Sequence, residues 1–167
     1  NFSDGIWTKT ILNEIFSHNK RIVISNEGNV GIGNSTPNAP LQFSNATVNR
    51  KIVLYDDNNN DNQFYGFGIN GATLRYQVDG TASSHVFYAG VDANNSTQLM
   101  RLAGNGNLSI GNGANASGVP SVAIGRQTTA SGEHSFAIGE TVTASGLNAI
   151  ALATGSLATG PYSLATG

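Results

Sequence analysis

Cysteine is absent, charged residues are few and no long apolar run occurs, and each absence excludes a class of protein. Without cysteine the chain has no disulfide framework, no thiolate metal ligand and no thiol nucleophile. Charged residues make up 11% of the 167 residues and the net charge is −2, so we expect no nucleic-acid partner. A membrane-spanning helix needs roughly 18 apolar residues in succession. The sequence has no such run, so we expect no membrane insertion by this segment.

Combinations of residues that carry out catalysis or hold metals are also scarce. The histidines at positions 18, 85 and 134 show no metal-ligand spacing, and no Ser-His-Asp order has a supporting context. Five acids lie in predicted loops, where Asx turns account for them. These acids are Asp56, Asp57, Asp61, Asp79 and Asp92. We therefore expect no enzyme activity, no catalytic residue, no cofactor and no bound metal.

Two alternatives for the loop acids remain open. The stretch 56–61 resembles an oxygen-rich calcium loop, although it lacks the glycine and the terminal glutamate of an EF-hand. Paired acids are also the catalytic groups with which some fibres cleave polysaccharides.

Glycine and asparagine are abundant where charge is scarce. The chain contains 21 glycines, and its short apolar stretches are separated by clusters of Asn, Asp, Gly and Ser. This composition predicts an all-β fold rich in turns, with a surface that is polar but mostly uncharged.

The last third of the sequence repeats with a period of 14 residues. The phrase SVAIG at 121–125 has counterparts at 135–139, 149–153 and 163–167, and NLSIG at 107–111 precedes them at the same spacing. A related phrase, TASG in its most regular form, lies between successive copies, so each unit consists of two half-repeats of seven.

A period of seven is also typical of coiled coils, but the composition of the repeat argues against helices. Each half-repeat carries small or β-branched residues and almost always a glycine, which costs about 1 kcal/mol relative to alanine within a helix. Short strands separated by glycine turns fit the pattern better, and a fixed short period predicts a solenoid.

Alternation within each strand places large apolar side chains on one face and alanine on the other. We expect the large side chains to fill the core of each coil, and the alanines to face a symmetry axis in a homotrimer, because so few short coils bury too little apolar surface alone. The predicted core residues are Leu108, Ile110, Val122, Ile124, Phe136, Ile138, Ile150 and Leu152. The predicted trimer-interface residues are Ala123, Ala130, Ala137, Ala144, Ala151 and Ala158.

The SxAIG and TASG phrases resemble the head repeats of trimeric autotransporter adhesins, and the resemblance covers residues 107–167. It implies a left-handed parallel β-roll that assembles as a homotrimer. Central phrases, such as FYGFGIN at 64–70 and HVFYAG at 85–90, resemble modules of bacteriophage tail fibres and related bacterial surface fibres. Together the two resemblances imply an extracellular location, on a bacterial cell surface or in a virion fibre.

Three parts are predicted along the chain. Residues 1–38 combine one short helix, indicated by apolar residues at helical spacing over 7–16, with a fibre joint. Residues 39–104 carry six candidate strands, which predict an antiparallel β-sandwich or barrel-like module, and residues 105–167 form the β-roll. Because the chain starts without methionine and stops within a repeat, we expect it to be a segment of a longer protein.

The expected function is recognition of, or attachment to, a cell surface through a glycan or protein receptor. We expect ligand-binding residues in the polar loop between two predicted strands and on nearby aromatic side chains, because function concentrates on loops of rigid scaffolds. The candidates are Tyr55, Asp56, Asp57, Asn58, Asn60, Asp61, Asn62, Tyr65, His85 and Tyr88. The alternatives are a purely structural spacer that carries a recognition tip located elsewhere, and a polysaccharide-degrading tail fibre.

Overall fold

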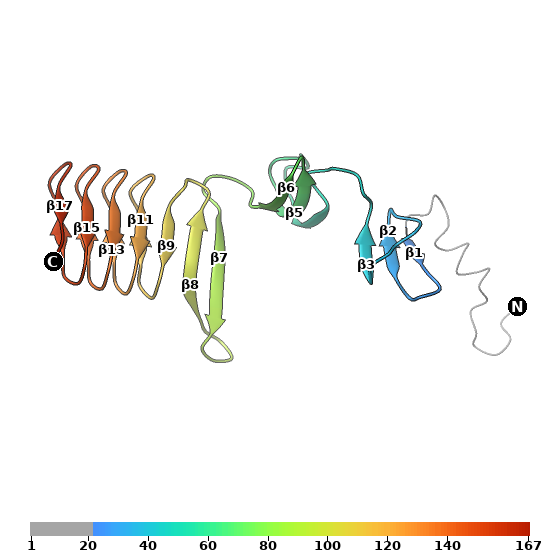
Figure 1. Cartoon of the computed structure of the whole chain (residues 1–167), viewed down its shortest axis with the longest axis horizontal. Helices are drawn as coiled ribbons and strands as arrows, with labels where there is room; N and C mark the ends of the chain where they lie inside the picture. The colour runs from blue at the N-terminus through green and yellow to red at the C-terminus, as the bar shows by residue number, and fades with distance from the viewer. Residues whose placement is uncertain (1–21) are drawn as a thin grey trace, which may run out of the picture. The chain divides into compact units, whose positions relative to one another are not determined.

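The computed structural model describes residues 22–167, which form seventeen strands and no helix (Figure 1). The predicted all-β fold is confirmed for these residues, whereas the predicted helix within 7–16 lies outside them. None of the described residues forms a helix long and apolar enough to cross a membrane. The described residues divide into two units, one of residues 22–53 and 66–76 and the other of residues 54–65 and 77–167.

The first sheet contains strands β1 Ile22–Ile24, β2 Val30–Ile32 and β3 Leu41–Phe43. The chain turns back after β1 at Gly28, whose φ of 85° suits glycine, and β2 then pairs antiparallel with β1. Strand β3 pairs parallel with β2. A Cβ on Gly31 would lie 2.2 Å from the carbonyl oxygen of Asn34, so only glycine fits at this position of β2.

A second three-stranded sheet has the order β4-β5-β6. Its strands are β4 Ile52–Tyr55, β5 Tyr65–Asn70 and β6 Thr73–Gln77. Phe67 of β5 and Tyr76 of β6 pack edge to face, with ring centroids 5.1 Å apart. Phe64, immediately before β5, is fully buried.

The C-terminal unit contains a seven-stranded sheet and a four-stranded sheet (Figure 1). The seven-stranded sheet consists of β7 Ser84–Gly90, β8 Ser96–Ala103, β9 Leu108–Ile110, β11 Val122–Ile124, β13 Phe136–Ile138, β15 Ile150–Leu152 and β17 Leu164–Ala165. The four-stranded sheet consists of β10 Asn115–Ala116, β12 Thr129–Ala130, β14 Thr143–Ala144 and β16 Leu157–Ala158. From β9 onward the chain alternates between the two sheets, and each strand pairs parallel with the strand one repeat later. The predicted parallel β-roll is therefore confirmed.

The strands of the central region do not form the predicted single sandwich or barrel. They are divided among small sheets: β3 pairs with β2, β4–β6 form their own sheet, and the antiparallel hairpin β7–β8 joins the sheet of the roll. The cause is the register between β8 and β9, in which Arg101 lies opposite Ser109. The β8 edge of the hairpin is thereby occupied by the roll and is not available for pairing within a central sandwich or barrel. The division of the chain at residues 38 and 104 stays a prediction about independently folding parts.

The structure reverses the predicted roles of the two faces of the roll. The alanines of the predicted interface have relative exposures of 0–1% and form the buried core of the coils, together with Val142. Large side chains such as Val122, Phe136 and Ile138 lie on the opposite, outer face of their strands and are only half-buried. The physical reason is the shortness of the turns, which hold the two sheets so close that only small side chains fit between them. The prediction that these alanines form the trimer interface is therefore wrong, because side chains buried inside a coil cannot contact another chain.

Glycines at the second turn of each coil allow the same close approach. A Cβ added to Gly118, Gly132 or Gly146 would lie 1.9–2.1 Å from the carbonyl oxygen of the glycine one repeat later. Successive coils therefore stack backbone on backbone at this corner, which explains why TASG and its variants recur with the glycine retained.

We predict that Gly132→Ala lowers the free energy of unfolding by about 2 kcal/mol or more, because the new Cβ would lie 2.0 Å from the oxygen of Gly146 and the coils would have to separate. The matched control is Gly90→Ala, where no atom lies within 4 Å of the added Cβ. Chemical denaturation of both variants measures the difference. Equal stability of Gly132→Ala and the unchanged chain would contradict the stacking argument.

Candidate functional site

The predicted polar loop follows β4 and is shaped first by Asp56. One carboxylate oxygen of Asp56 accepts the backbone N–H groups of Asn58 and Asn59, with distances of 3.0 Å and 2.8 Å. This Asx turn holds Asn59 in the left-handed region, with a φ of 48°. Asp56 therefore determines the conformation of the loop. Because one of its carboxylate oxygens already accepts two backbone hydrogen bonds, that oxygen is less available to a ligand.

A second Asx turn follows directly and is built by Asn60. Its side-chain oxygen accepts the backbone N–H groups of Asn62 and Gln63, both at 2.9 Å, and its amide nitrogen donates to the side chain of Gln63 at 3.0 Å. Gln77, at the end of β6, donates to the carbonyl oxygen of Asn62 at 3.0 Å. The loop is thus a defined structure that is fixed at both of its turns.

Two carboxylates and one amide of this loop belong to exposed residues. Asp57 and Asp61 are both exposed, and the side chain of Asn58 donates to Asp57 at 2.9 Å and to Asp79 at 3.4 Å. The loop therefore offers carboxylate and amide groups on one short segment. Such groups are suited to hydrogen bonding with hydroxyl-bearing or amide-bearing ligands.

Two tyrosines stand beside the loop where it meets the strands. The rings of Tyr55 and Tyr65 have centroids 6.0 Å apart, and the hydroxyl of Tyr65 is hydrogen-bonded to Ser83 at 2.9 Å. Tyr55 is 60% exposed, so one face of this aromatic pair is available to solvent. The structure thus brings together the loop residues and both tyrosines of the predicted site.

His85 and Tyr88 belong to a different element. Both lie on β7, where His85 is half-buried opposite Leu102 and Tyr88 is exposed opposite Gln98. A bulge between Phe87 and Tyr88 shifts the register there. Side chains alternate between the two faces of a strand, so His85 and Tyr88, three residues apart, lie on opposite faces of β7 and the structure does not bring them together.

The turn of the β7–β8 hairpin contains another acid that the sequence placed in an Asx turn. Asp92 accepts the backbone N–H of Asn94 at 2.8 Å and the side-chain amide of Asn95 at 2.9 Å. These hydrogen bonds hold the pKa of Asp92 below its usual value, and the bond from the backbone N–H of Asn94 contributes most. Asp92 therefore has a structural role, as predicted.

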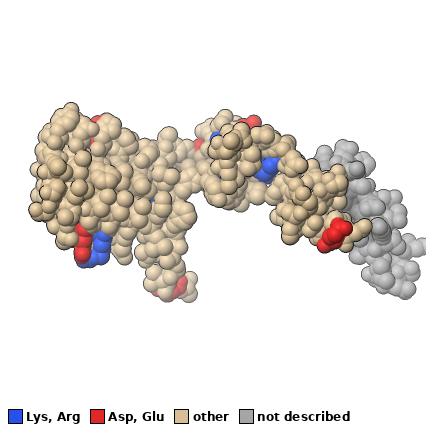
Figure 2. Space-filling model, viewed as in Figure 1, with Lys and Arg blue, Asp and Glu red and all other residues tan. Residues whose placement is uncertain are grey.

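Charged side chains are sparse on the face drawn in Figure 2. Residues 22–167 contain no group of three or more His, Asp or Glu side chains placed to hold a metal ion. The calcium alternative for the stretch 56–61 therefore gains no support from a carboxylate cluster.

Two residues that terminate the first coil of the roll were not predicted from the sequence. Strand β10 is the edge of the four-stranded sheet, so its Ala116 has no preceding coil to pair with. The hydroxyl oxygen of Ser109 accepts a hydrogen bond from the backbone N–H of Ala116 at 3.0 Å. The side-chain amide of Asn107 donates to the carbonyl oxygen of Ala116 at 2.9 Å. The signal was present in the sequence, since NLSIG has Asn and Ser where the next copy, SVAIG, has Ser121 and Ala123. These polar replacements cap the solenoid.

Comparison with known proteins identifies the repeats of the roll. The family model of the YadA head domain repeat matches two copies, at residues 116–139 and 144–167, and leaves more than half of the chain outside the match. A search of curated proteins and a search of solved structures gave no match. The C-terminal part thus carries YadA head domain repeats in a β-solenoid fold, similar to the head of a trimeric autotransporter adhesin. The resemblance of the central region to tail-fibre modules gains no support.

We predict that Ser109→Ala destabilises the first coil by about 1–3 kcal/mol, because the N–H of Ala116 would lose its acceptor. Amide hydrogen exchange at Ala116 should accelerate, while exchange at Ala130 in the next coil changes less. Ser117→Ala, which removes an exposed hydroxyl from the adjoining turn, is the matched control. Unchanged exchange at Ala116 in the Ser109 variant would show that the cap is unimportant.

Proposed function

We propose that the chain is a non-catalytic head segment of a trimeric adhesin on a bacterial cell surface, and that it attaches this surface to a glycan or protein receptor. The observation that carries the proposal is the solenoid of 14-residue coils, in which two stretches match the YadA head domain repeat. The predicted left-handed winding of the roll belongs to the same proposal.

Assembly into a trimer is supported by the large apolar side chains on the outer face of the roll. The parallel register aligns them in two rows that cross the sheet. The first row is Leu108, Val122, Phe136, Ile150 and Leu164, and the second is Ile110, Ile124, Ile138 and Leu152. Such a continuous apolar surface is unfavourable in water, at about 25 cal/mol per Å². Three copies related by a cyclic axis would cover it on every chain at once.

The apolar rows continue beyond the roll onto the hairpin. Leu102 lies opposite Leu108, and Met100 lies opposite Ile110, so both extend the rows across β8. Phe87 on β7, opposite Met100, is 60% exposed. We therefore include the hairpin in the proposed trimer surface, which makes this surface wider than the repeats alone.

The receptor site proposed first is the loop 56–62 with Tyr55 and Tyr65. Its exposed carboxylates and amides suit hydrogen bonding to sugar hydroxyls or to peptide groups, and the aromatic pair offers a ring face beside them. A trimer presents three copies, so weak individual sites gain through effective concentration. Exposed Tyr88 on the hairpin is the second candidate, whereas His85 lies opposite Leu102 on the face that the proposed trimer would cover.

The test removes charge from the loop without disturbing its turns. Asp56 is left in place because it holds the Asx turn, and the double substitution Asp57→Asn with Asp61→Asn removes two exposed carboxylates. We expect at least a tenfold loss of binding to cells or to arrayed glycans, because a loss at each site is multiplied over three copies. Asp92→Asn makes the same chemical change in a different turn and should bind as the unchanged chain does.

Light scattering on each variant confirms that a mass of three chains is retained. Unchanged binding by the double variant would contradict the loop site and direct attention to Tyr88. Failure of the unchanged trimer to bind any surface would contradict attachment and favour a spacer role.

A further inference from the structure

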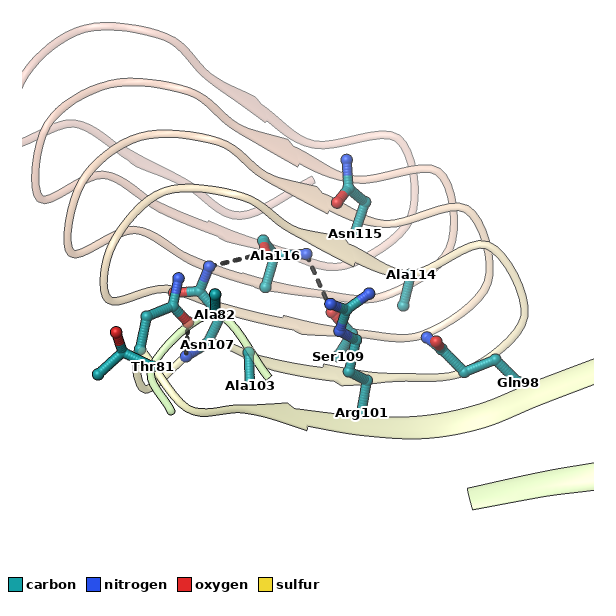
Figure 3. Close-up of a pocket in the computed structure, with 11 residues that line it drawn as sticks. Thr81, Ala82, Gln98, Arg101, Ala103, Asn107, Ser109, Ala114, Asn115 and Ala116 are labelled. Carbon is teal, nitrogen blue, oxygen red and sulfur yellow. Dashed lines mark hydrogen bonds between the residues drawn. The ribbon is translucent and has the colours of Figure 1, made fainter. Parts of the chain in front are cut away.

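The two sheets of the C-terminal unit do not end together, and this mismatch leaves a hollow. The seven-stranded sheet continues past β9 into β8 and β7, whereas the four-stranded sheet ends at β10. The inner face of β8 is therefore uncovered where another coil would otherwise lie. A cavity of about 250 Å³ occupies this place, and strands β8, β9 and β10 contribute to its walls (Figure 3).

The free edge of β10 beside this hollow is not available for pairing with another strand. The N–H and carbonyl groups of Ala116 that face it are already bonded to Ser109 and Asn107. Pairing with a further strand would have to displace both side chains. The hollow is thus suited to a small molecule that interacts with side chains.

Arg101 is the charged group of this cavity. The residue lies opposite Ser109 on the inner face of β8, and its side chain extends into the hollow (Figure 3). Its Nε donates to the hydroxyl of Ser84 at 2.9 Å, which orients the guanidinium. The two terminal nitrogens make no hydrogen bond to any part of the chain that the structure describes, so their donors remain available.

The other lining residues are neutral, and several carry amides. None of the lining residues is acidic, so nothing within the cavity wall neutralises Arg101. Gln98 and Asn105 supply amide donors and acceptors around the hollow, and Thr81 adds a hydroxyl. The lining contains no aromatic or large aliphatic side chain, which disfavours an apolar ligand.

We infer that this cavity binds a sugar residue that carries a carboxylate. A guanidinium fork matches a carboxylate through two parallel hydrogen bonds. The surrounding amides match the hydroxyl groups of a sugar ring, and the volume corresponds to about eight water molecules, which is enough for one ring. The inference rests on the proposed attachment function and specifies an acidic glycan as one of its receptors, at a site distinct from the loop 56–62.

The experiment titrates the full chain with D-glucuronate, D-glucose and acetate while NMR signals of Arg101 and Gln98 are followed. Glucuronate should bind, and glucose and acetate should each bind at least about tenfold more weakly, because each lacks one half of the interaction. Arg101→Gln should weaken glucuronate binding about tenfold or more, whereas Arg126→Gln, a matched change on the outside of the roll, should leave it unchanged. Equal binding of glucuronate and glucose, or of glucuronate and acetate, would overturn the inference.

Two further measurements keep the test independent of folding and of the proposed function. Gln98→Glu places a negative charge in the cavity wall without touching the bond between Arg101 and Ser84, so it should also weaken glucuronate binding, with an unchanged melting temperature as its control. Tight glucuronate binding by both variants would overturn the site. In cell attachment, a loss caused by Arg101→Gln supports the acidic-glycan receptor, and full attachment by this variant overturns it while leaving the proposed adhesin function intact. Glucuronate binding by a trimer that attaches to no cell would contradict the proposed function alone.

Discussion

The narrow interior of each coil is the constraint on which the rest of this structure depends. Successive coils are joined strand to strand, as where the N–H of Val122 donates to the carbonyl oxygen of Ser135 at 3.0 Å. Short turns then bring the two sheets of each coil so close that alanines such as Ala123 and Ala137 fill the space completely. Alanine in this fold is therefore the core residue.

The position of the large side chains follows from this constraint. Because the interior has no room for them, valine, isoleucine and phenylalanine must lie on the outer face, where one chain alone leaves them partly in water. Apolar surface of this extent is stable only when it is covered. The same local geometry that forms the coil thus supplies the driving force for the proposed trimer, in which weak binding sites on each chain would act together.

Much of the roll could be predicted from the sequence, because a 14-residue period directly sets which residues pair. The choice between inner and outer face could not, since alternation separates large from small side chains without giving the distance between the sheets. The central sandwich was wrong for a related reason: apolar stretches predict strands, but the pairing of β8 with β9 depends on a register that no local pattern encodes. The Asx turns at Asp56 and Asp92 were predictable, because they need only neighbouring residues. The cavity at Arg101 was not, since it arises where two sheets of different width end.

The absence of cysteine from the chain permits a direct test of which face lies inside. Single substitutions Ala137→Cys and Phe136→Cys place a thiol on adjacent residues of β13, one on each face. The account predicts that the thiol at position 137 reacts with a maleimide only after denaturation, at every protein concentration. It predicts that the thiol at position 136 reacts in dilute, dissociated chains, becomes protected as the trimer forms, and cross-links copies under oxidation. Rapid labelling of position 137 in the folded protein, or cross-linking of copies through it, would contradict the account.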